Sequence, residues 1–320
     1  MPAISIMIEG QMGLTWPRWQ RLVAEVEALG FAGLFRSDHF TGGRPPDSPS
    51  LEMIVSLTYL AANTRRIHFG PLVAPISFRH PVQLARQAAA IDDLSGGRLI
   101  LGVGAGWNER EHHAFGFPLG DVPTRMARLE EGLEVISRLL QSDTPSTYEG
   151  QHFQLHDAIL LPRPVRAGGP PILIGGNGPR RTLPLVARYA RWWNAVALSP
   201  EDFRARSAEL DAALRVAGRQ PGEVRRTAMT LAFFGKDRAA LERKLDSAAR
   251  LWPALAGQPL ADQVSLLRQS EALVGGAEEL VEQIGAYAAA GVEELMLQWL
   301  DMDDIDGLRA FAEQVLPRVG

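Results

Sequence analysis

The 320-residue chain contains no cysteine. This absence excludes disulfides, thiolate nucleophiles, iron–sulfur clusters and cysteine-based zinc sites, so redox chemistry would need a bound cofactor. Lysine is nearly absent as well, because Lys236 and Lys244 are the only lysines among 33 basic residues. Schiff-base catalysis therefore has almost no candidate residue.

Long apolar runs are also missing from the sequence. None approaches the roughly 20 residues of a membrane-spanning helix. The first apolar run, Ile4 to Ile8, is too short for a signal peptide and has no basic segment before it. The formal charge is -4, with 33 basic and 37 acidic residues interleaved, which gives no electrostatic footprint for nucleic acid or a membrane surface. We therefore expect a soluble, cytoplasmic protein that binds neither.

Common catalytic motifs are lacking too. The seven histidines show no H-E-x-x-H or comparable ligand spacing, and neither a G-x-S-x-G elbow nor a Walker G-x-x-x-x-G-K sequence occurs. We expect no metal site, and the hydrolase and nucleotide-triphosphatase interpretations lose most of their support. The expected partner is a small-molecule substrate.

What the sequence does contain is a regular alternation of short apolar runs and amphipathic segments. Helical periodicity between the runs is typified by Trp19, Leu22 and Val26, which fall on one face of a segment that ends at Gly30. The apolar runs that we interpret as strands are Ile4 to Ile8, Gly33 to Phe35, Ile67 to Val73, Leu99 to Val103, Ile172 to Ile174, Trp193 to Leu198, Thr227 to Phe234 and Glu294 to Trp299.

Eight strands separated by helices predict an α/β protein with a (β/α)8 TIM barrel, and a doubly wound open sheet is the main alternative. Two long intervals predict insertions after strands 4 and 7, at about 107–169 and 236–275. The first insertion is predicted to contain a helical segment and a hairpin near Tyr148 to Phe153, and the second is predicted to be helical around Trp252 to Arg268. We find no linker, so residues 1–320 are expected to form one domain.

In such barrels the active site follows the carboxyl ends of the strands. After the second strand, Asp38 and His39 place a carboxylate beside an imidazole, which suits proton transfer unless Asp38 only caps the loop and His39 only packs. After the fourth strand, Glu109 and Glu111 are better explained as exposed carboxylates at a helix start. The small residues and tryptophan that would let a planar ring approach the backbone there are Gly104, Ala105, Gly106 and Trp107.

The sharper signal follows the fifth strand, where a glycine-rich turn opens into a helix. Consecutive backbone N–H groups at such a turn converge on an anion, and glycines remove the side chains that would block it. A plain strand-to-helix turn is the competing explanation. Pro179 suits the first helical turn, and Arg180 or Arg181 could add charge. The predicted phosphate-binding residues are Gly175, Gly176, Asn177 and Gly178.

Taken in order, these motifs resemble those of the luciferase-like monooxygenase superfamily, and specifically its branch that depends on the deazaflavin coenzyme F420. The resemblance covers nearly the whole chain. It depends on Gly30-Phe31-x-x-Leu34-Phe35-Arg36-Ser37-Asp38-His39, Arg79-His80-Pro81, Ser95-Gly96-Gly97-Arg98-Leu99-x-Leu101-Gly102-x-Gly104-Ala105-Gly106-Trp107 and Pro170-Pro171-Ile172-Leu173-Ile174-Gly175-Gly176.

The resemblance implies a barrel in which the flavin or deazaflavin ring lies across the strand ends. Its neighbours would be Asp38, His39, Val73, Ala74, Pro75 and Gly104 to Trp107, with the phosphate at Gly175 to Gly178. A bulge or non-proline cis peptide is expected at Val73-Ala74. Relatives are commonly dimers or larger, so a homodimer is expected. Sugar-phosphate dehydrogenases of this superfamily carry a glutamate where this chain has Trp107, which argues against that substrate class.

The resemblance thus implies hydride transfer between F420 and a small unsaturated or carbonyl substrate, with His39 as proton donor or as a group that stabilises the developing charge of the ring. If Trp16, Trp107 and Trp193 line the mouth, they would suit an apolar or aromatic substrate. Two alternatives remain open. One is an FMN-dependent monooxygenase that uses reduced flavin and O₂, and the other is a catalytically silent flavin-binding barrel.

Overall fold

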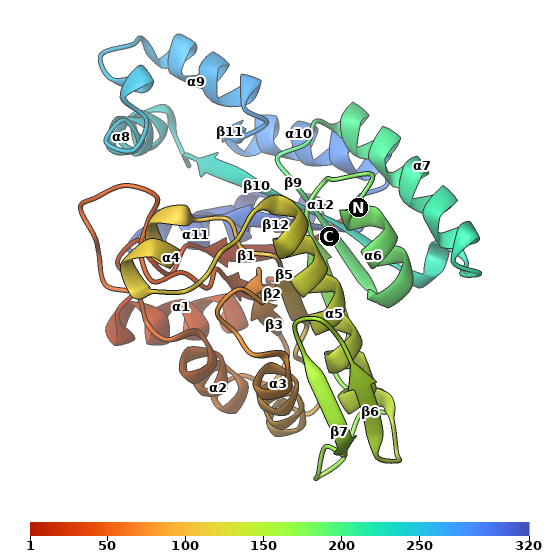
Figure 1. The fold of residues 1–320 in the computed structure, drawn as a ribbon. Coiled ribbons are helices and arrows are strands. Elements are labelled where there is room, and N and C mark those ends of the chain that lie inside the picture. The colour runs from red at the N-terminus through yellow and green to blue at the C-terminus, as the bar shows by residue number, and fades with distance from the viewer. Residues whose placement is uncertain (320) are drawn as a thin grey trace.

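The computed structural model describes residues 1–319 as a ring of parallel strands surrounded by helices (Figure 1). All eight predicted strands are present, and the third is split in two. The strands of the ring are β1 (Ala3–Ile8), β2 (Gly33–Arg36), β3 (His68–Pro71), β4 (Ala74–Pro75), β5 (Leu101–Gly104), β8 (Ile172–Gly175), β9 (Trp192–Val196), β10 (Arg225–Phe234) and β12 (Glu294–Gln298).

The pairing order establishes a barrel. Hydrogen bonds join β3, β2, β1, β12, β10, β9, β8, β5 and β4 in that order, and every pairing in the ring is parallel. A parallel bridge between Phe69 and Leu99 connects the two ends of this path. The predicted (β/α)8 barrel is therefore confirmed, and the alternative of an open doubly wound sheet is wrong.

The helices form the outer layer of the barrel (Figure 1). The helices of residues 1–319 are α1 (Trp16–Ala28), α2 (Met53–Asn63), α3 (Pro81–Ser95), α4 (Glu109–Phe115), α5 (Val122–Gln141), α6 (Thr182–Tyr189), α7 (Pro200–Val216), α8 (Arg238–Ala248), α9 (Leu260–Gln269), α10 (Ala277–Ala289), α11 (Ile305–Gln314) and α12 (Leu316–Val319), with 3-10 turns at Pro221–Glu223 and Pro253–Leu255. None of these helices combines the length and apolar character needed to cross a bilayer.

The helix ends follow from local sequence. Pro17 lies in the first turn of α1, and Gly30 adopts a φ of +89° just beyond its end, where a left-handed residue was expected. Helix α3 begins at Pro81 and stops at Gly96, whose φ is +71°. The strand that follows each helix can then return directly to the barrel.

The two insertions predicted at about 107–169 and 236–275 have different structures. The first contains α4, α5 and the predicted hairpin, formed by β6 (Ser146–Glu149) and β7 (Gln154–Ala158), which projects beside α5 (Figure 1). The second is helical around Trp252 to Arg268 as expected, but in two pieces, a 3-10 turn and α9. Trp252 is separated from α9 by a 3-10 turn, by Gly257 at φ +71° and by Pro259. Glycine and proline do not continue a helix readily.

Candidate active site

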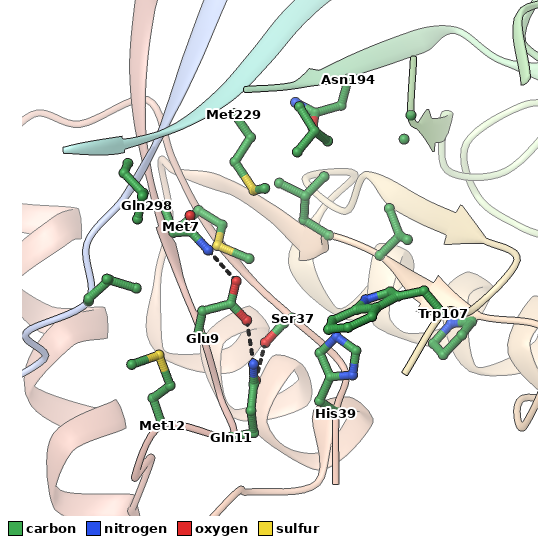
Figure 2. Close-up of a pocket in the computed structure, with 18 of the residues that line it drawn as sticks. Met7, Glu9, Gln11, Met12, Ser37, His39, Trp107, Asn194, Met229 and Gln298 are labelled. Carbon is green, nitrogen blue, oxygen red and sulfur yellow. Dashed lines mark hydrogen bonds between the residues drawn. The ribbon is translucent and has the colours of Figure 1, made fainter. Parts of the chain in front are cut away.

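A cavity of about 630 Å³ opens at the carboxyl ends of the barrel strands (Figure 2). Its floor includes Met7 and Leu72, which belong to the apolar cluster inside the barrel. The residues that line it come from all eight strand positions or from the segments that follow them. They are Met7, Glu9, Gln11, Met12, Ser37, His39, Leu72, Val73, Pro75, Gly106, Trp107, Gly175, Gly176, Asn194, Val196, Met229, Leu231, Leu251, Trp252, Gln298 and Leu300.

About half of the residues predicted from the sequence line this cavity. They are His39, Val73, Pro75, Gly106, Trp107, Gly175 and Gly176. The other predicted residues lie behind or beside them and do not line the cavity. They are Asp38, Ala74, Gly104, Ala105, Asn177 and Gly178. The cavity thus brings together side chains that lie more than 130 positions apart in the chain, such as His39 and Gly176.

His39 is held by a carboxylate that sequence reasoning placed on the surface. Its Nδ1 lies 2.8 Å from Oε1 of Glu111, and the other oxygen of Glu111 accepts a hydrogen bond from the Phe40 backbone N–H at 3.0 Å. Glu111 is fully buried, so its expected exposure at a helix start is wrong, whereas Glu109 is exposed as expected. With Nδ1–H donating to Glu111, Nε2 is the ring nitrogen that can exchange a proton with a ligand.

The environment of His39 favours its charged form. Burial by itself would lower the pKa of the imidazole, but the hydrogen bond and the negative charge of Glu111 outweigh it, so the pKa of His39 is raised above its usual value. Trp107 packs edge-on against the ring, with 5.4 Å between the ring centroids, while remaining 62% exposed. His39 is therefore a partly enclosed acid beside an aromatic wall.

Asp38 does not orient His39. Its carboxylate binds Arg79 through two hydrogen bonds, Nε to Oδ2 at 2.8 Å and Nη2 to Oδ1 at 2.9 Å. This bidentate pair is nearly buried and fixes the direction of the loop after β2. Asp38 therefore holds the loop through Arg79, and the carboxylate that binds the imidazole of His39 is that of Glu111.

The buried guanidinium of Arg36 also fixes the loop after β2. Arg36 is completely buried and donates to three neutral oxygens, the carbonyls of Ser37 and Leu51 and the hydroxyl of Ser56. Burial lowers the pKa of Arg36 to about 10. Because Arg36 and Asp38 are both fixed by several hydrogen bonds, His39 sits on a loop with little freedom to move.

The glycines after the fourth strand position have a packing role, and Gly106 also lines the cavity. A Cβ at Gly104 would lie 2.4 Å from Cγ2 of Val73, so the side chain of Val73 occupies the space that Gly104 leaves. Gly106 has a φ of +82°, and a Cβ there would meet the Ser77 hydroxyl. The non-proline cis peptide lies at Leu72-Val73, one bond before the expected position.

The turn after β8 presents several backbone N–H groups without protein acceptors. Gly176 adopts a φ of +123°, and its own N–H is bound to the carbonyl of Asn194 at 2.9 Å. Within residues 1–319, no acceptor is found for the N–H groups of Asn177, Gly178, Arg180 and Arg181. Helix α6 begins at Thr182, so Pro179 precedes it and does not occupy the predicted first turn. The turn and the start of α6 together offer a set of free donors.

Charge near this turn is positive. Arg180 and Arg181 are exposed, and in the part of the chain that the structure describes neither forms an ion pair. The side chain of Asn177 is used to fix the turn, because its Nδ2 donates to the Val196 carbonyl at 2.8 Å and its Oδ1 accepts from the Val196 N–H at 3.0 Å. These residues fit a phosphate, which needs convergent donors and a compensating charge.

A row of polar side chains lies on the side of the cavity opposite the turn after β8. Figure 2 shows Ser37, Gln11 and Glu9 linked in sequence, with Ser37 Oγ donating to Gln11 Oε1 at 2.7 Å and Gln11 Nε2 donating to Glu9 Oε2 at 2.7 Å. Gln298 also donates to Glu9. Sequence reasoning missed this row, because a single glutamate after the first strand has no motif around it.

Of the three tryptophans expected at the mouth of the barrel, Trp107 alone lines the cavity. Trp193 is fully buried, stacks on Phe203 at 5.2 Å and donates to the Gly176 carbonyl, so it supports the turn rather than the cavity mouth. Trp16 packs on Tyr59 and does not line the cavity. Trp107 lines the cavity as expected. Trp252, from the segment after α8, also lines it and was not predicted to do so.

Within residues 1–319, no group of three or more potential ligand side chains is placed to hold a metal ion.

Comparison with known proteins extends these observations. Residues 7–294 match the family model described as luciferase-like monooxygenase. The 4-hydroxyprotoasukamycin monooxygenase of Streptomyces nodosus subsp. asukaensis is 35% identical over 187 residues, which span 58% of this chain and 48% of that protein. The F420-dependent glucose-6-phosphate dehydrogenase of Microbacterium testaceum is 29% identical over 318 residues, or 92% of this chain and 90% of that one.

A solved structure shares the whole fold. An F420-dependent secondary alcohol dehydrogenase in complex with an F420-acetone adduct superimposes with a TM-score of 0.81, covering 100% of both chains at 21% identity. At this identity the likeness concerns the fold alone.

Proposed function

Since the chain belongs to the luciferase-like monooxygenase family and is an oxidoreductase, we propose that it transfers a hydride between coenzyme F420 and a small apolar or aromatic substrate with a carbonyl or an activated double bond. The observation that carries the proposal is the His39–Glu111 pair at the wall of a largely apolar cavity. F420, when bound, would supply the hydride donor or acceptor.

His39 has the role of proton donor in this proposal. Its Nδ1 is fixed by Glu111, so Nε2 delivers a proton to the substrate oxygen or carbon as the hydride arrives, and takes it back in the reverse direction. Leu72, Val73 and Pro75 present an apolar surface on which a planar ring can lie, and this surface excludes water from the reacting atoms.

The free N–H groups after β8 would hold the cofactor phosphate. Asn177, Gly178, Arg180 and Arg181 supply donors, and the exposed guanidinium groups of the two arginines supply positive charge. The F420-dependent relative that aligns over nearly the full length of this chain supports F420 as the cofactor.

A second candidate is an FMN-dependent monooxygenase that uses reduced flavin and O₂. The monooxygenase relative, which has the highest identity of the proteins compared above, favours it, although the alignment covers only part of each chain. The same phosphate site would serve, so the two candidates differ in cofactor and in oxygen use. Oxygen consumed in proportion to product would identify the monooxygenase.

Titration of the purified apoprotein with F420 and, separately, with FMN tests the proposal. We expect micromolar binding of F420, followed by calorimetry or by fluorescence quenching, and much weaker binding of FMN. Tight FMN binding without F420 binding would replace the proposal with the monooxygenase candidate. Binding of neither would contradict both.

Substitution of Glu111 by glutamine should change the pH dependence of turnover. The raised pKa keeps His39 protonated to higher pH, so the rate of carbonyl reduction is maintained below that pKa and falls as pH rises through it. Without the charge of Glu111, burial dominates and lowers the pKa of His39, which moves the fall in rate to lower pH. The oxidation direction needs the neutral imidazole, so its rise in rate should move to lower pH as well.

The matched control is Glu109→Gln, since Glu109 is exposed and lies on the same helix. Its pH–rate profile, measured under the same conditions, should overlie that of the wild type. An unshifted profile for Glu111→Gln would show that the pair does not set the protonation of the acid.

A further inference from the structure

The lining of the cavity is nearly free of positive charge. Within residues 1–319, none of the side chains that line it is a lysine or an arginine, and its two ionisable side chains are Glu9 and His39. The charge of a protonated His39 is balanced by the buried carboxylate of Glu111, 2.8 Å from Nδ1. A phosphate or carboxylate group on the substrate would therefore find no unpaired cation on the walls, and would lie in the same space as the carboxylate of Glu9. Burial of an anion without a partner is unfavourable.

The cations of a neighbouring hollow do not supply a free positive charge to the cavity. That hollow shares Met12, Leu251 and Leu300 with the cavity and contains Arg18, Lys244 and Arg250. Arg18 is paired with Asp303, and Lys244 with Asp304, at 2.5 Å in each case. Arg250 is exposed and lines the hollow rather than the cavity.

Glu9 is held as an acceptor by a directed chain of hydrogen bonds. The Gly10 N–H donates to Ser37 Oγ at 2.9 Å, and the Ser37 hydroxyl donates to Gln11 Oε1. This fixes the Gln11 amide with its NH₂ toward Glu9. Gln298 donates to the second oxygen of Glu9. Two of the roughly four acceptor positions of the carboxylate are thus occupied, and the others need donors from a ligand or water.

Apolar side chains lie on the same side of the cavity as this carboxylate. Met12 follows Glu9 in the loop after β1, Leu300 follows Gln298 after β12, and Leu251 and Trp252 extend the wall from the segment after α8. Figure 2 shows Met12, Glu9 and Gln11 on one side of His39, and Trp107 on the other. A molecule with an apolar body and one polar donor is complementary to this arrangement.

We propose that Glu9 selects the charge of the substrate, so that the site takes a neutral or positively charged organic molecule that carries an alcohol or amine group apart from the bond that is reduced, and the O–H or N–H of that group donates to Glu9. Phosphorylated and carboxylated molecules of the same shape are rejected. This inference rests on the proposed function, since it names the substrate class of the same cavity. It places the substrate at the Glu9 side and leaves the glycine turn after β8 for the cofactor.

The test compares four probes in which a phenyl ring bears one carbon with the polar group: benzyl alcohol, benzylamine, benzoate and benzyl phosphate. Their dissociation constants are measured near neutral pH by calorimetry or ligand-observed NMR, with and without F420, for the wild type and Glu9→Gln. The control is Glu313→Gln, which removes the same charge from an exposed position on α11. F420 titration of each variant is a separate readout, so a failure of cofactor binding can be told apart from a failure of charge selection.

We expect the wild type and the control, with F420 bound so that the donors after β8 are occupied, to bind the amine and the alcohol at least about tenfold more tightly than either anion, because a hydrogen bond to a charged group contributes that much or more. In Glu9→Gln the amine should lose about tenfold in affinity and benzoate should gain, with F420 binding unchanged. Equal affinity of the wild type for amine and anion, an unchanged ranking in Glu9→Gln, or no binding of any probe would overturn the inference.

Discussion

Replacing His39 by alanine should reduce turnover by about 10²- to 10⁴-fold, the range typical of a lost general acid, while F420 binding is retained. The reason lies in the geometry of the pair. Glu111 fixes one ring nitrogen and raises the pKa of the imidazole, so the proton is positioned and is held to higher pH than on an ordinary imidazole. The phosphate donors after β8 lie on another part of the cavity and are untouched by the change.

The measurement uses single turnovers, because product release then does not hide the chemical step. Protein loaded with reduced F420 is mixed with cyclohexenone, or protein loaded with oxidised F420 with cyclohexanol, and the absorbance of the deazaflavin is followed. His113→Ala is the control, since His113 is exposed on the same helix as Glu111. A rate for His39→Ala equal to that of the wild type would remove His39 from the mechanism.

Replacing Gly176 by leucine should weaken F420 binding by at least about 100-fold. Its φ of +123° is accessible mainly to glycine. A Cβ there would lie 3.5 Å from Cγ2 of Thr182, in the space between the turn and the start of α6. The loss of two charge-assisted hydrogen bonds, about 1.5 to 3 kcal/mol each, accounts for the expected magnitude.

Gly218→Leu separates loss of the phosphate site from general strain. Gly218 also has a positive φ, +74°, has no atom within 4 Å of its Cβ position, and follows α7 away from the cavity. Calorimetric titration with F420 and thermal unfolding should be run on both variants. If Gly176→Leu binds F420 as tightly as the wild type while remaining folded, the phosphate is held elsewhere.

The barrel could be predicted from the sequence because its signals are local. Strands buried on both faces appear as unbroken apolar runs, and residues such as Pro81 and Gly96 mark the ends of a helix by their own backbone preferences. The segment after Trp252 was less predictable, because a helical apolar pattern there is interrupted by Gly257 and Pro259, whose breaking effect outweighs it.

The side-chain partners in the site could be predicted only in part. Glu109 and Glu111 lie two residues apart on one helix and so face different directions, but the sequence does not say which direction is inward. That depends on how α4 packs, which places Glu111 against His39 and leaves Glu109 in solvent. The same holds for Gly104, whose neighbour Val73 comes from the link between β3 and β4.

The segment that carries Leu251 and Trp252 has an apolar cluster of its own. Side chains from α8, α9 and β11 (Leu273–Gly275), among them Leu245, Leu267 and Val274, pack together apart from the main core. In Figure 1 these elements lie beyond the end of β10, at one side of the barrel. A substitution inside this cluster can therefore move Leu251 and Trp252, and with them one wall of the cavity, while the barrel that holds His39 and the glycine turn stays in place.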